Sequence, residues 1–211
     1  MNGKPKLKLY IQTMSVLEFR PQGIYCRQGD FFIDPWRPVE RALITHGHSD
    51  HARYGSKKYL CTDIAAPVIR HRLGDVKIET ISYEEEINLN GVKISFHPAG
   101  HVPGSAQILA EIKGERWVVS GDYKVEDDGL STPFKPIKCH SFISECTFGL
   151  PAFNWLPQEE IFREINNWWL QCISEGITPI LAAYGLGKAQ RLISGIDLSL
   201  IHISEPTRPM N

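Results

Sequence analysis

The sequence contains no hydrophobic run long enough to cross a membrane. A transmembrane helix needs about 20 consecutive, mostly apolar residues, and no stretch of the 211 residues approaches this. The first ten residues alternate lysine with apolar side chains, without the uninterrupted apolar segment of a secretion signal. We therefore expect a soluble, non-secreted protein with no membrane partner.

Cysteine is scarce and shows no pattern. The five cysteines are widely spaced and form no Cys-x-x-Cys pair: Cys26, Cys61, Cys139, Cys146 and Cys172. An odd, scattered set argues against a disulfide framework and against a cysteine zinc knuckle. The composition fits a reducing compartment, and we expect a cytoplasmic protein.

An excess of charge of one sign is also lacking. Lysine and arginine total 23 against 24 acidic residues, which gives a formal net charge of -1. Such a chain has no general electrostatic attraction to nucleic acid, unlike a strongly basic binding protein. Charge therefore neither supports nor excludes a DNA or RNA substrate.

Alternating apolar and polar residues predict short strands, mainly in the first half of the chain. Strands are expected at residues 31–34, 42–45, 92–96, 107–112 and 117–120. Helices are expected at 64–73 and 158–175, each followed by glycine, and an apolar strand at 179–183 leads to a helix beginning at Lys188. Strands sufficient for two sheets, with helices between them, predict an α/β layered sandwich.

The densest group of metal-binding side chains is residues 45–51, Thr-His-Gly-His-Ser-Asp-His. It follows directly on an expected strand. Alternation directs His46 and His48 to one side, whereas Asp50 and His51 begin the next turn and can face a second ion. Zinc accepts imidazole nitrogen and carboxylate oxygen, and hydrolytic two-metal sites hold their ions about 3.5 to 4 Å apart. The segment therefore predicts ligands for two metals.

Two later strand ends supply further ligands. His101 lies in a glycine-containing loop, Pro-Ala-Gly-His-Val-Pro-Gly, which leaves its ring free to point at a metal. Asp122 follows the strand at 117–120, and a single carboxylate there is suited to bridging two cations. Upstream, Asp34 closes another strand, where it can accept the second ring N–H of a ligating histidine and fix its tautomer. We expect Asp34 to support the ligands rather than to bind metal.

This ordered set resembles motifs one to four of the metallo-β-lactamase superfamily. In chain order the motifs are Asp34, His46-x-His48-x-Asp50-His51, His101 and Asp122. The resemblance implies an αββα sandwich and two divalent metal ions, with zinc favoured and manganese as the alternative. It implies one metal held by His46, His48 and His101, another held by Asp50 and His51, and Asp122 shared between them.

Two further segments resemble the β-CASP nucleases of that superfamily. Residues 144–149, Ser-Glu-Cys-Thr-Phe-Gly, resemble their acidic motif, with Glu145 as its acidic residue, and residues 183–191 resemble the start of their cap domain. Residues 29–38, 121–129 and 147–151 add a likeness to bacterial ligase-associated DNA exonucleases, over about 17–195. Cys146 stands where that family usually has serine, and Gly185 where alanine is common. The family's cap returns a further histidine ligand that this sequence does not contain.

The resemblance divides the chain into four parts. These are an N-terminal extension at 1–16, a metallo-β-lactamase core at 17–176, the start of a β-CASP cap at 177–196 and a tail at 197–211. The tail shows no helical or strand period and resembles translated sequencing-adapter sequence. We expect the native sequence to stop near Ile196; an ordinary disordered tail is the alternative.

Together these features predict a metal-dependent phosphodiester hydrolase, a DNA exonuclease that acts in DNA repair with a DNA ligase and, by the same resemblance, a helicase. The expected catalytic residues are Asp50, His51, Asp122 and Glu145. Lys188 and Arg191 lie about one helical turn apart and are expected to contact backbone phosphates. Three alternatives stay open: an RNA-processing ribonuclease, a small-molecule hydrolase of the same fold, and a metal-binding fragment without activity.

Overall fold

A computed structural model describes residues 15–200 of the chain. Most of the expected N-terminal extension, residues 1–14, lies outside the described residues. The same holds for residues 201–211, which make up most of the expected tail.

The first of two β-sheets has six strands in chain order. They are β1 (Glu18–Arg20), β2 (Gly23–Cys26), β3 (Phe31–Ile33), β4 (Arg41–Leu43), β5 (Lys58–Thr62) and β6 (Ile78–Ile81). The first three strands pair antiparallel, and β3 to β6 pair parallel. Parallel pairing brings the carboxyl ends of β3 and β4 to one edge of the sheet.

The second sheet has five strands in the order β11-β10-β9-β8-β7. They are β7 (Glu86–Leu89), β8 (Val92–Pro98), β9 (Ala106–Ile112), β10 (Glu115–Val119) and β11 (Ser141–Ile143). All pairs are antiparallel except β10 with β11, which is parallel. Because β8 and β10 both run antiparallel to β9, their carboxyl ends lie at the same edge.

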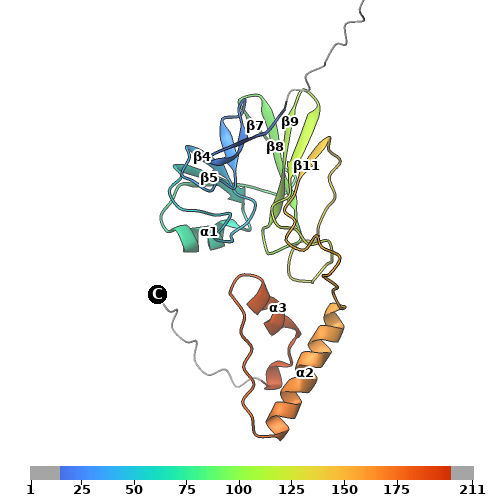
Figure 1. Ribbon diagram of the computed structural model, residues 1–211. Helices are drawn as coiled ribbons and strands as arrows, with labels where there is room; N and C mark the ends of the chain where they lie inside the picture. Colours follow the sequence, from blue (N-terminus) through green and yellow to red (C-terminus); the bar gives the residue numbers. More distant parts are fainter. Residues whose placement is uncertain (1–14, 201–211) are drawn as a thin grey trace, which may run out of the picture.

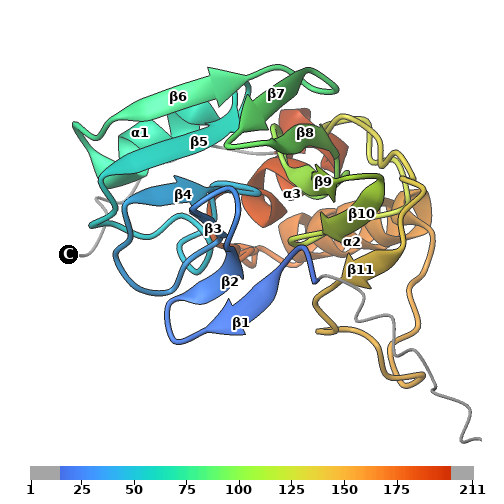
Figure 2. The same ribbon diagram turned by 90° about the horizontal axis from the view of Figure 1, so that it is seen from above.

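The main core lies between the two sheets, which face each other (Figure 2). Phe31, Ile33 and Leu43 from the first sheet join Phe96 and Ile108 from the second, and all five are 0% exposed. Alternation along each strand directs these side chains inward, as expected for two packed sheets. The predicted sandwich of strands is confirmed.

Helix α1 (Ala66–Leu73) covers the outer face of the first sheet (Figure 1). Its buried residues Ala66, Ile69 and Leu73 pack in a second apolar cluster with Tyr59 and Cys61 of β5. The helix begins two residues later than the sequence predicts and ends as predicted, before Gly74. One outer helical layer of the expected αββα arrangement is therefore present.

The outer face of the second sheet carries irregular chain. Gln107 of β9 points outward, because its neighbours Ala106 and Ile108 belong to the core between the sheets. Its Nε2 donates to the carbonyl oxygens of Pro98 and Lys135 at 2.9 and 2.8 Å. The loop between β10 and β11 thus lies across this face.

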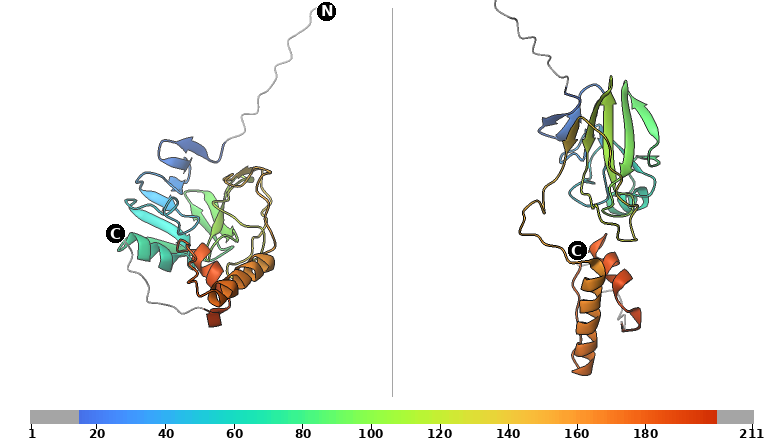
Figure 3. Two further views of the ribbon diagram at one scale, coloured as in Figure 1. Left: turned by 60° about the horizontal axis from the view of Figure 1, so that its bottom comes forward. Right: turned by 90° about the vertical axis from the view of Figure 1, so that its right-hand side faces the viewer.

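The last described elements are α2 (Gln158–Ser174), α3 (Lys188–Gly195) and the short 3-10 turn η1 (Leu198–Leu200). Helix α2 packs against α3, and the pair lies below the edge of the two sheets (Figures 1 and 3). The domain boundaries expected after residues 16, 176 and 196 stay predictions. No helix within residues 15–200 is long and apolar enough to cross a membrane.

The strand expected at residues 179–183 does not form. These residues run beside α2 as irregular chain (Figure 1), so this prediction was wrong. An apolar pattern favours a strand only where a neighbouring strand can complete the backbone hydrogen bonds, and none pairs with this segment within the described part of the chain.

Candidate metal centre

Four strand ends bring the predicted ligands to one edge of the sandwich. Asp34 directly follows β3, His46 comes three residues after β4, His101 follows β8 and Asp122 follows β10. The two sheets are joined here by a backbone hydrogen bond of 2.8 Å from Ala106 N to Thr45 O. Strands β3 and β4 run in the same direction, and so do β8 and β10, so all four end at this edge. This is why the predicted ligands meet there: residues 34, 46–51, 101 and 122.

Three histidines and one aspartate form a compact cluster. The atoms that converge are His46 Nε2, His48 Nδ1, His101 Nε2 and Asp122 Oδ2, with contacts of 2.9 Å between His46 and His48 and 3.2 Å between His101 and His48. Asp122 Oδ2 lies 3.7 Å from His46 Nε2 and 3.5 Å from His101 Nε2. One donor atom from each residue lies within 4.8 Å of all the others.

This donor set fits a divalent metal such as zinc. Zinc binds imidazole nitrogen and carboxylate oxygen at about 2.0 to 2.2 Å in tetrahedral geometry, so its ligand atoms lie roughly 3.3 to 3.6 Å from each other. The separations of 2.9, 3.2, 3.5 and 3.7 Å surround that value. Without a cation between them, two ring nitrogens that both carry lone pairs would repel at such distances.

A second, smaller set of donors adjoins the first across Asp122. While Oδ2 of Asp122 faces His46 and His101, its Oδ1 lies 3.2 Å from Nε2 of His51. Oδ2 of Asp50 lies 3.6 Å from the same His51 nitrogen, and the Asp50 side chain is 68% exposed. The two oxygens of Asp122 therefore point to different histidines, which is the arrangement that a bridging carboxylate requires.

Asp34 and Thr45 fix the orientation of two of the rings. Asp34 Oδ2 lies 2.7 Å from His51 Nδ1 and accepts the Thr45 hydroxyl at 2.5 Å. Since that hydroxyl donates to Asp34, its oxygen is left to accept from Nδ1 of His46 at 3.1 Å. Both rings then keep Nε2 for the metal cluster. Asp34 makes the contact with a histidine ring that the sequence predicts, and its supporting role in metal binding stays a prediction; the contacts of Thr45 were not predicted.

The close approach of Thr45 depends on Gly121. A Cβ atom at Gly121 would lie 2.5 Å from Thr45 Oγ1, and the backbone there has φ of +55°, which glycine adopts without strain. Glycine immediately before Asp122 therefore lets the second sheet approach the histidine segment closely. The Gly-Asp pair in the sequence was the available indication.

Electrostatics keep most of the candidate ligands in a state that can bind metal. Burial lowers the pKa of His46 and of His101, so both rings are neutral near pH 7. Burial opposes ionisation of Asp122, but the hydrogen bond from His51 and the neighbouring imidazoles lower its pKa to about 2. For His51, burial is outweighed by hydrogen bonds to Asp122 and Asp34, which raise its pKa to about 10. A metal bound there would release the Nε2 proton.

The remaining predicted residues lie nearby or apart. Glu145 comes two residues after β11, next to the end of β10, and its charge acts on the pKa of His101. Lys188 lies over the ring of Tyr184, 4.8 Å from its centre. Nε of Arg191 donates to Gln158 Oε1 of α2 at 2.6 Å, so this side chain ties α3 to α2.

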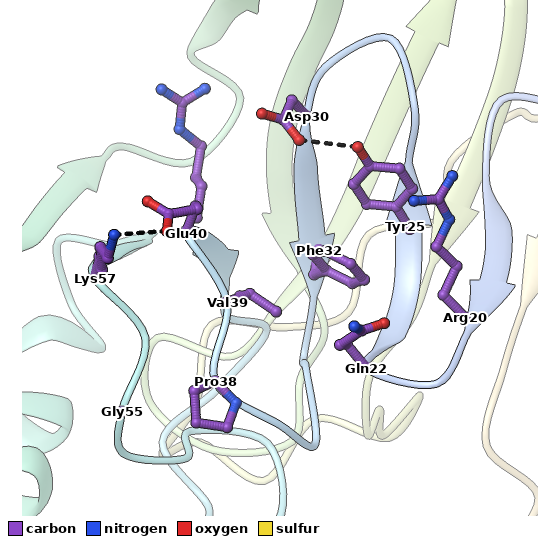
Figure 4. A pocket seen from close by; sticks show the side chains of 11 residues that line it. Arg20, Gln22, Tyr25, Asp30, Phe32, Pro38, Val39, Glu40, Gly55 and Lys57 are labelled. Carbon is purple, nitrogen blue, oxygen red and sulfur yellow. Dashed lines mark hydrogen bonds and ion pairs between the residues drawn. The ribbon is translucent and has the colours of Figure 1, made fainter.

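A surface hollow of about 430 Å³ lies elsewhere, on the outer face of β1 to β4. Figure 4 shows it lined by Arg20, Tyr25, Asp30, Glu40 and Lys57, with none of the clustered histidines. Two contacts link side chains of its lining: Lys57 pairs with Glu40 at 2.7 Å, and Tyr25 OH donates to Asp30 at 2.8 Å. The hollow is therefore separate from the metal cluster.

Comparisons with known proteins place the chain among nucleic-acid-processing relatives. A scan against models of protein families found no match. The chain is 30% identical over 186 residues to the "Probable DNA ligase" of Opitutus terrae, which covers 86% of this chain and 18% of that protein. It is 30% identical over 125 residues to "Cleavage and polyadenylation specificity factor subunit 3" of Dictyostelium discoideum, covering 57% and 16%. It is 32% identical over 123 residues to "Endoribonuclease YSH1" of Saccharomyces cerevisiae, covering 57% and 16%. The chain thus spans less than a fifth of the length of each of these relatives.

Proposed function

Because the chain belongs to the metallo-β-lactamase superfamily, in its β-CASP branch, we propose that it is a metal-dependent hydrolase of phosphodiester bonds in nucleic acid. The observation that carries this proposal is the cluster of His46, His48, His101 and Asp122, whose donor atoms lie within 4.8 Å of one another. The second donor set around His51 adjoins it through Asp122.

The chain would hold two divalent ions, with zinc favoured and manganese as the alternative. His46, His48 and His101 would hold the first, and Asp50 and His51 the second, with Asp122 shared between them. Such ions lower the pKa of bound water from about 15.7 to about 7 and neutralise charge that develops on phosphate oxygens.

The protein's own contribution is orientation and proton handling. Asp34 and Thr45 hold the rings of His46 and His51 in place, so the donor atoms need no rearrangement before the reaction. The Asp50 carboxylate is 68% exposed beside His51 and would accept a proton from attacking water. Glu145 is also exposed and close enough to affect the pKa of His101, so it would act beside that histidine.

We take DNA as the substrate, with the chain acting as an exonuclease in repair beside a DNA ligase. Support comes from the relative named a probable DNA ligase, whose alignment covers 86% of this chain. The alignments to the two RNA-processing relatives cover 57%. The names of these two relatives favour a ribonuclease instead, which is therefore the second candidate function.

The test is hydrolysis of end-labelled single-stranded DNA, double-stranded DNA and RNA of one sequence, with zinc or manganese added after chelation. Asp122→Asn should lower cleavage by more than about 100-fold, because loss of outer-shell partners alone costs 10- to 100-fold in metal sites. His71→Ala is the matched control, since His71 is an exposed histidine on α1 away from the cluster.

Each outcome has a separate meaning. Cleavage of DNA that depends on Asp122 supports the proposal, and cleavage of RNA alone transfers it to the ribonuclease. Metal uptake without cleavage of either polymer would make this chain a metal-binding fragment, and equal activity of the Asp122→Asn and wild-type chains would refute the metal assignment.

A further inference from the structure

The chain that leads into α3 touches the metal cluster at one ligand. Nε2 of His48 lies 2.8 Å from the carbonyl oxygen of Leu186, although the two residues are 138 positions apart. Leu186 belongs to the turn at residues 184–187, which precedes α3. In Figure 1 the α2–α3 pair lies below the edge of the sheets that carries the ligands, and this turn bridges the two.

The contact determines which nitrogen of His48 carries a proton. A backbone carbonyl oxygen can only accept a hydrogen bond, so Nε2 of His48 must be the donor. In the neutral ring, Nδ1 then keeps its lone pair. Nδ1 is the atom that lies 2.9 Å from His46 Nε2 and 3.2 Å from His101 Nε2, so the contact directs the lone pair of His48 into the cluster.

The turn packs against the histidine segment. A Cβ atom at Gly47 would lie 2.9 Å from Val68 Cγ1 of α1 and at an ordinary contact distance, 3.5 Å, from Leu186 Cδ2, so Leu186 borders the residue between His46 and His48. A Cβ atom at Gly187 would lie 3.0 Å from Val102 Cγ1, next to His101. The turn therefore lies against both ligand loops, from β4 and from β8.

The turn is held in a backbone conformation that a free loop would seldom adopt. Leu186 has φ of +61° and Gly187 has φ of +107°, and positive φ is unfavourable for a residue such as leucine. The N–H of Gly187 donates to the side chain of Gln190 at 2.9 Å, and Ala189 N donates to Tyr184 O at 3.2 Å. Helix α3 thus braces the turn with the Leu186 carbonyl facing His48.

We propose that the 184–187 turn is a positioning element of the metal centre, in which the Leu186 carbonyl holds His48 in the Nε2–H tautomer so that Nδ1 binds metal. Like the other three histidines of the site, His48 belongs to a segment that follows a strand of the sandwich, but its Nε2 contacts the turn before α3. The proposal makes the affinity of the first site depend on the part of the chain beyond α2. It rests on the metal site proposed above and does not require that the substrate be DNA.

Two glycine variants provide a matched test. Gly187→Ala forces a side chain into a position with φ of +107° and against Val102, which displaces the Leu186 carbonyl. Gly176→Ala places the same change at φ of +69° between α2 and the irregular segment, with nothing within 4 Å of the new Cβ. Both carry backbone strain, but only the first disturbs the contact with His48.

Two readouts are needed, and neither is catalytic activity. The first is cobalt and zinc affinity, measured by competition with a chromophoric chelator. The second is the ring tautomer of His48 in the metal-free chain, read from proton–nitrogen correlation spectra and assigned with His48→Gln. We expect Nε2–H in the wild type and in Gly176→Ala. For Gly187→Ala we expect a mixed tautomer and metal affinity at least about 10-fold weaker, the usual effect of losing an outer-shell partner.

A second pair of variants, which introduces no backbone strain, tests the same contact in case the glycine variants misfold. Gln190→Ala removes the acceptor that holds Gly187 N–H, and Gln171→Ala removes an exposed glutamine of α2 that contacts Glu175. Only the first should weaken metal binding. If Gly187→Ala and Gln190→Ala keep the wild-type affinity and tautomer, the inference is overturned while the metal site stands. A wild-type chain that takes up no metal would overturn both.

Discussion

Nδ1 of His51 lies 2.7 Å from Oδ2 of Asp34, although the two residues are 17 positions apart in the chain. The same carboxylate accepts the hydroxyl and the backbone N–H of Thr45 at 2.5 and 2.8 Å. A single side chain at the end of β3 therefore orients the histidine segment that follows β4. The proposed metal centre would depend on Asp34, although this residue lies behind the candidate ligands.

Asp34→Asn should weaken metal binding by about 10- to 100-fold without unfolding the chain. One oxygen can still accept the Thr45 N–H, but the amide nitrogen then faces Nδ1 of His51 as a donor. That favours the tautomer with its proton on Nε2, the nitrogen needed for metal. Metal titration monitored by calorimetry measures the change.

Asp30→Asn is the control for that variant. Asp30, like Asp34, itself has a positive φ, +52° compared with +43°, but it accepts a hydrogen bond from Tyr25 in the hollow on the outer face of β1 to β4. Equal loss of metal affinity in both variants would mean that Asp34 acts through general stability.

Gly121→Ala should destabilise the fold more than Gly114→Ala. Both glycines have positive φ, +55° and +84°, so alanine costs about 1 to 2 kcal/mol at either position. At Gly114 the new Cβ meets nothing within 4 Å, whereas at Gly121 it lies 2.5 Å from Thr45 Oγ1. Displacing Thr45 should add about 1 to 3 kcal/mol. Urea unfolding followed by circular dichroism measures both, and equal losses would contradict the packing seen here.

Asp128→Asn should lower stability at pH 7 and have no effect in acid. Burial opposes ionisation of Asp128, but N–H groups of Leu130 and Ser131 and the ion pair with Lys124 lower its pKa. A lowered folded-state pKa stabilises the fold above the unfolded value of about 3.9, and this is lost as the pH falls through the folded value. The asparagine retains the N–H contacts, so we expect a loss of about 0.5 to 1 kcal/mol at pH 7.

Unfolding free energies at pH 7 and near pH 3 provide the measurement for Asp128. Asp127→Asn is the neighbouring control, because Asp127 is exposed and accepts the Gly129 N–H, with no ion pair to it in residues 15–200. A loss for Asp128→Asn that persists unchanged in acid would show that its effect is not due to charge.

The five cysteines should differ sharply in their reactivity. Cys146 is exposed and Cys139 partly exposed, whereas the other three are buried. Burial also raises the pKa of Cys26 and raises that of Cys61 to about 12, which disfavours the reactive thiolate. A thiol reagent followed by mass spectrometry should label Cys146 first and Cys139 next. Cys146→Ser should remove the fastest reaction, and early labelling of Cys61 would contradict the core described here.

The sequence by itself determined the sandwich of strands and the positions of the candidate ligands. A strand with period two, such as β8, indicates which side chains face the other sheet, because alternation is a local property of the backbone. The spacing of His46, His48, Asp50 and His51 is likewise local. His101 and Asp122 could be added because each follows a strand, and strand ends are where loops carry functional side chains.

Only the tertiary structure decided which groups contact the candidate ligands and how the segments after residue 176 pack. The contact of His48 with the Leu186 carbonyl involves a backbone atom, which no residue type marks in advance. Arg191 donates to Gln158, a residue far from it in the chain. Residues 179–183 form no strand, because no other strand of the described residues pairs with them. Side-chain type and periodicity can be read directly from the sequence. Hydrogen bonds between residues 33 and 138 positions apart form only when the chain packs.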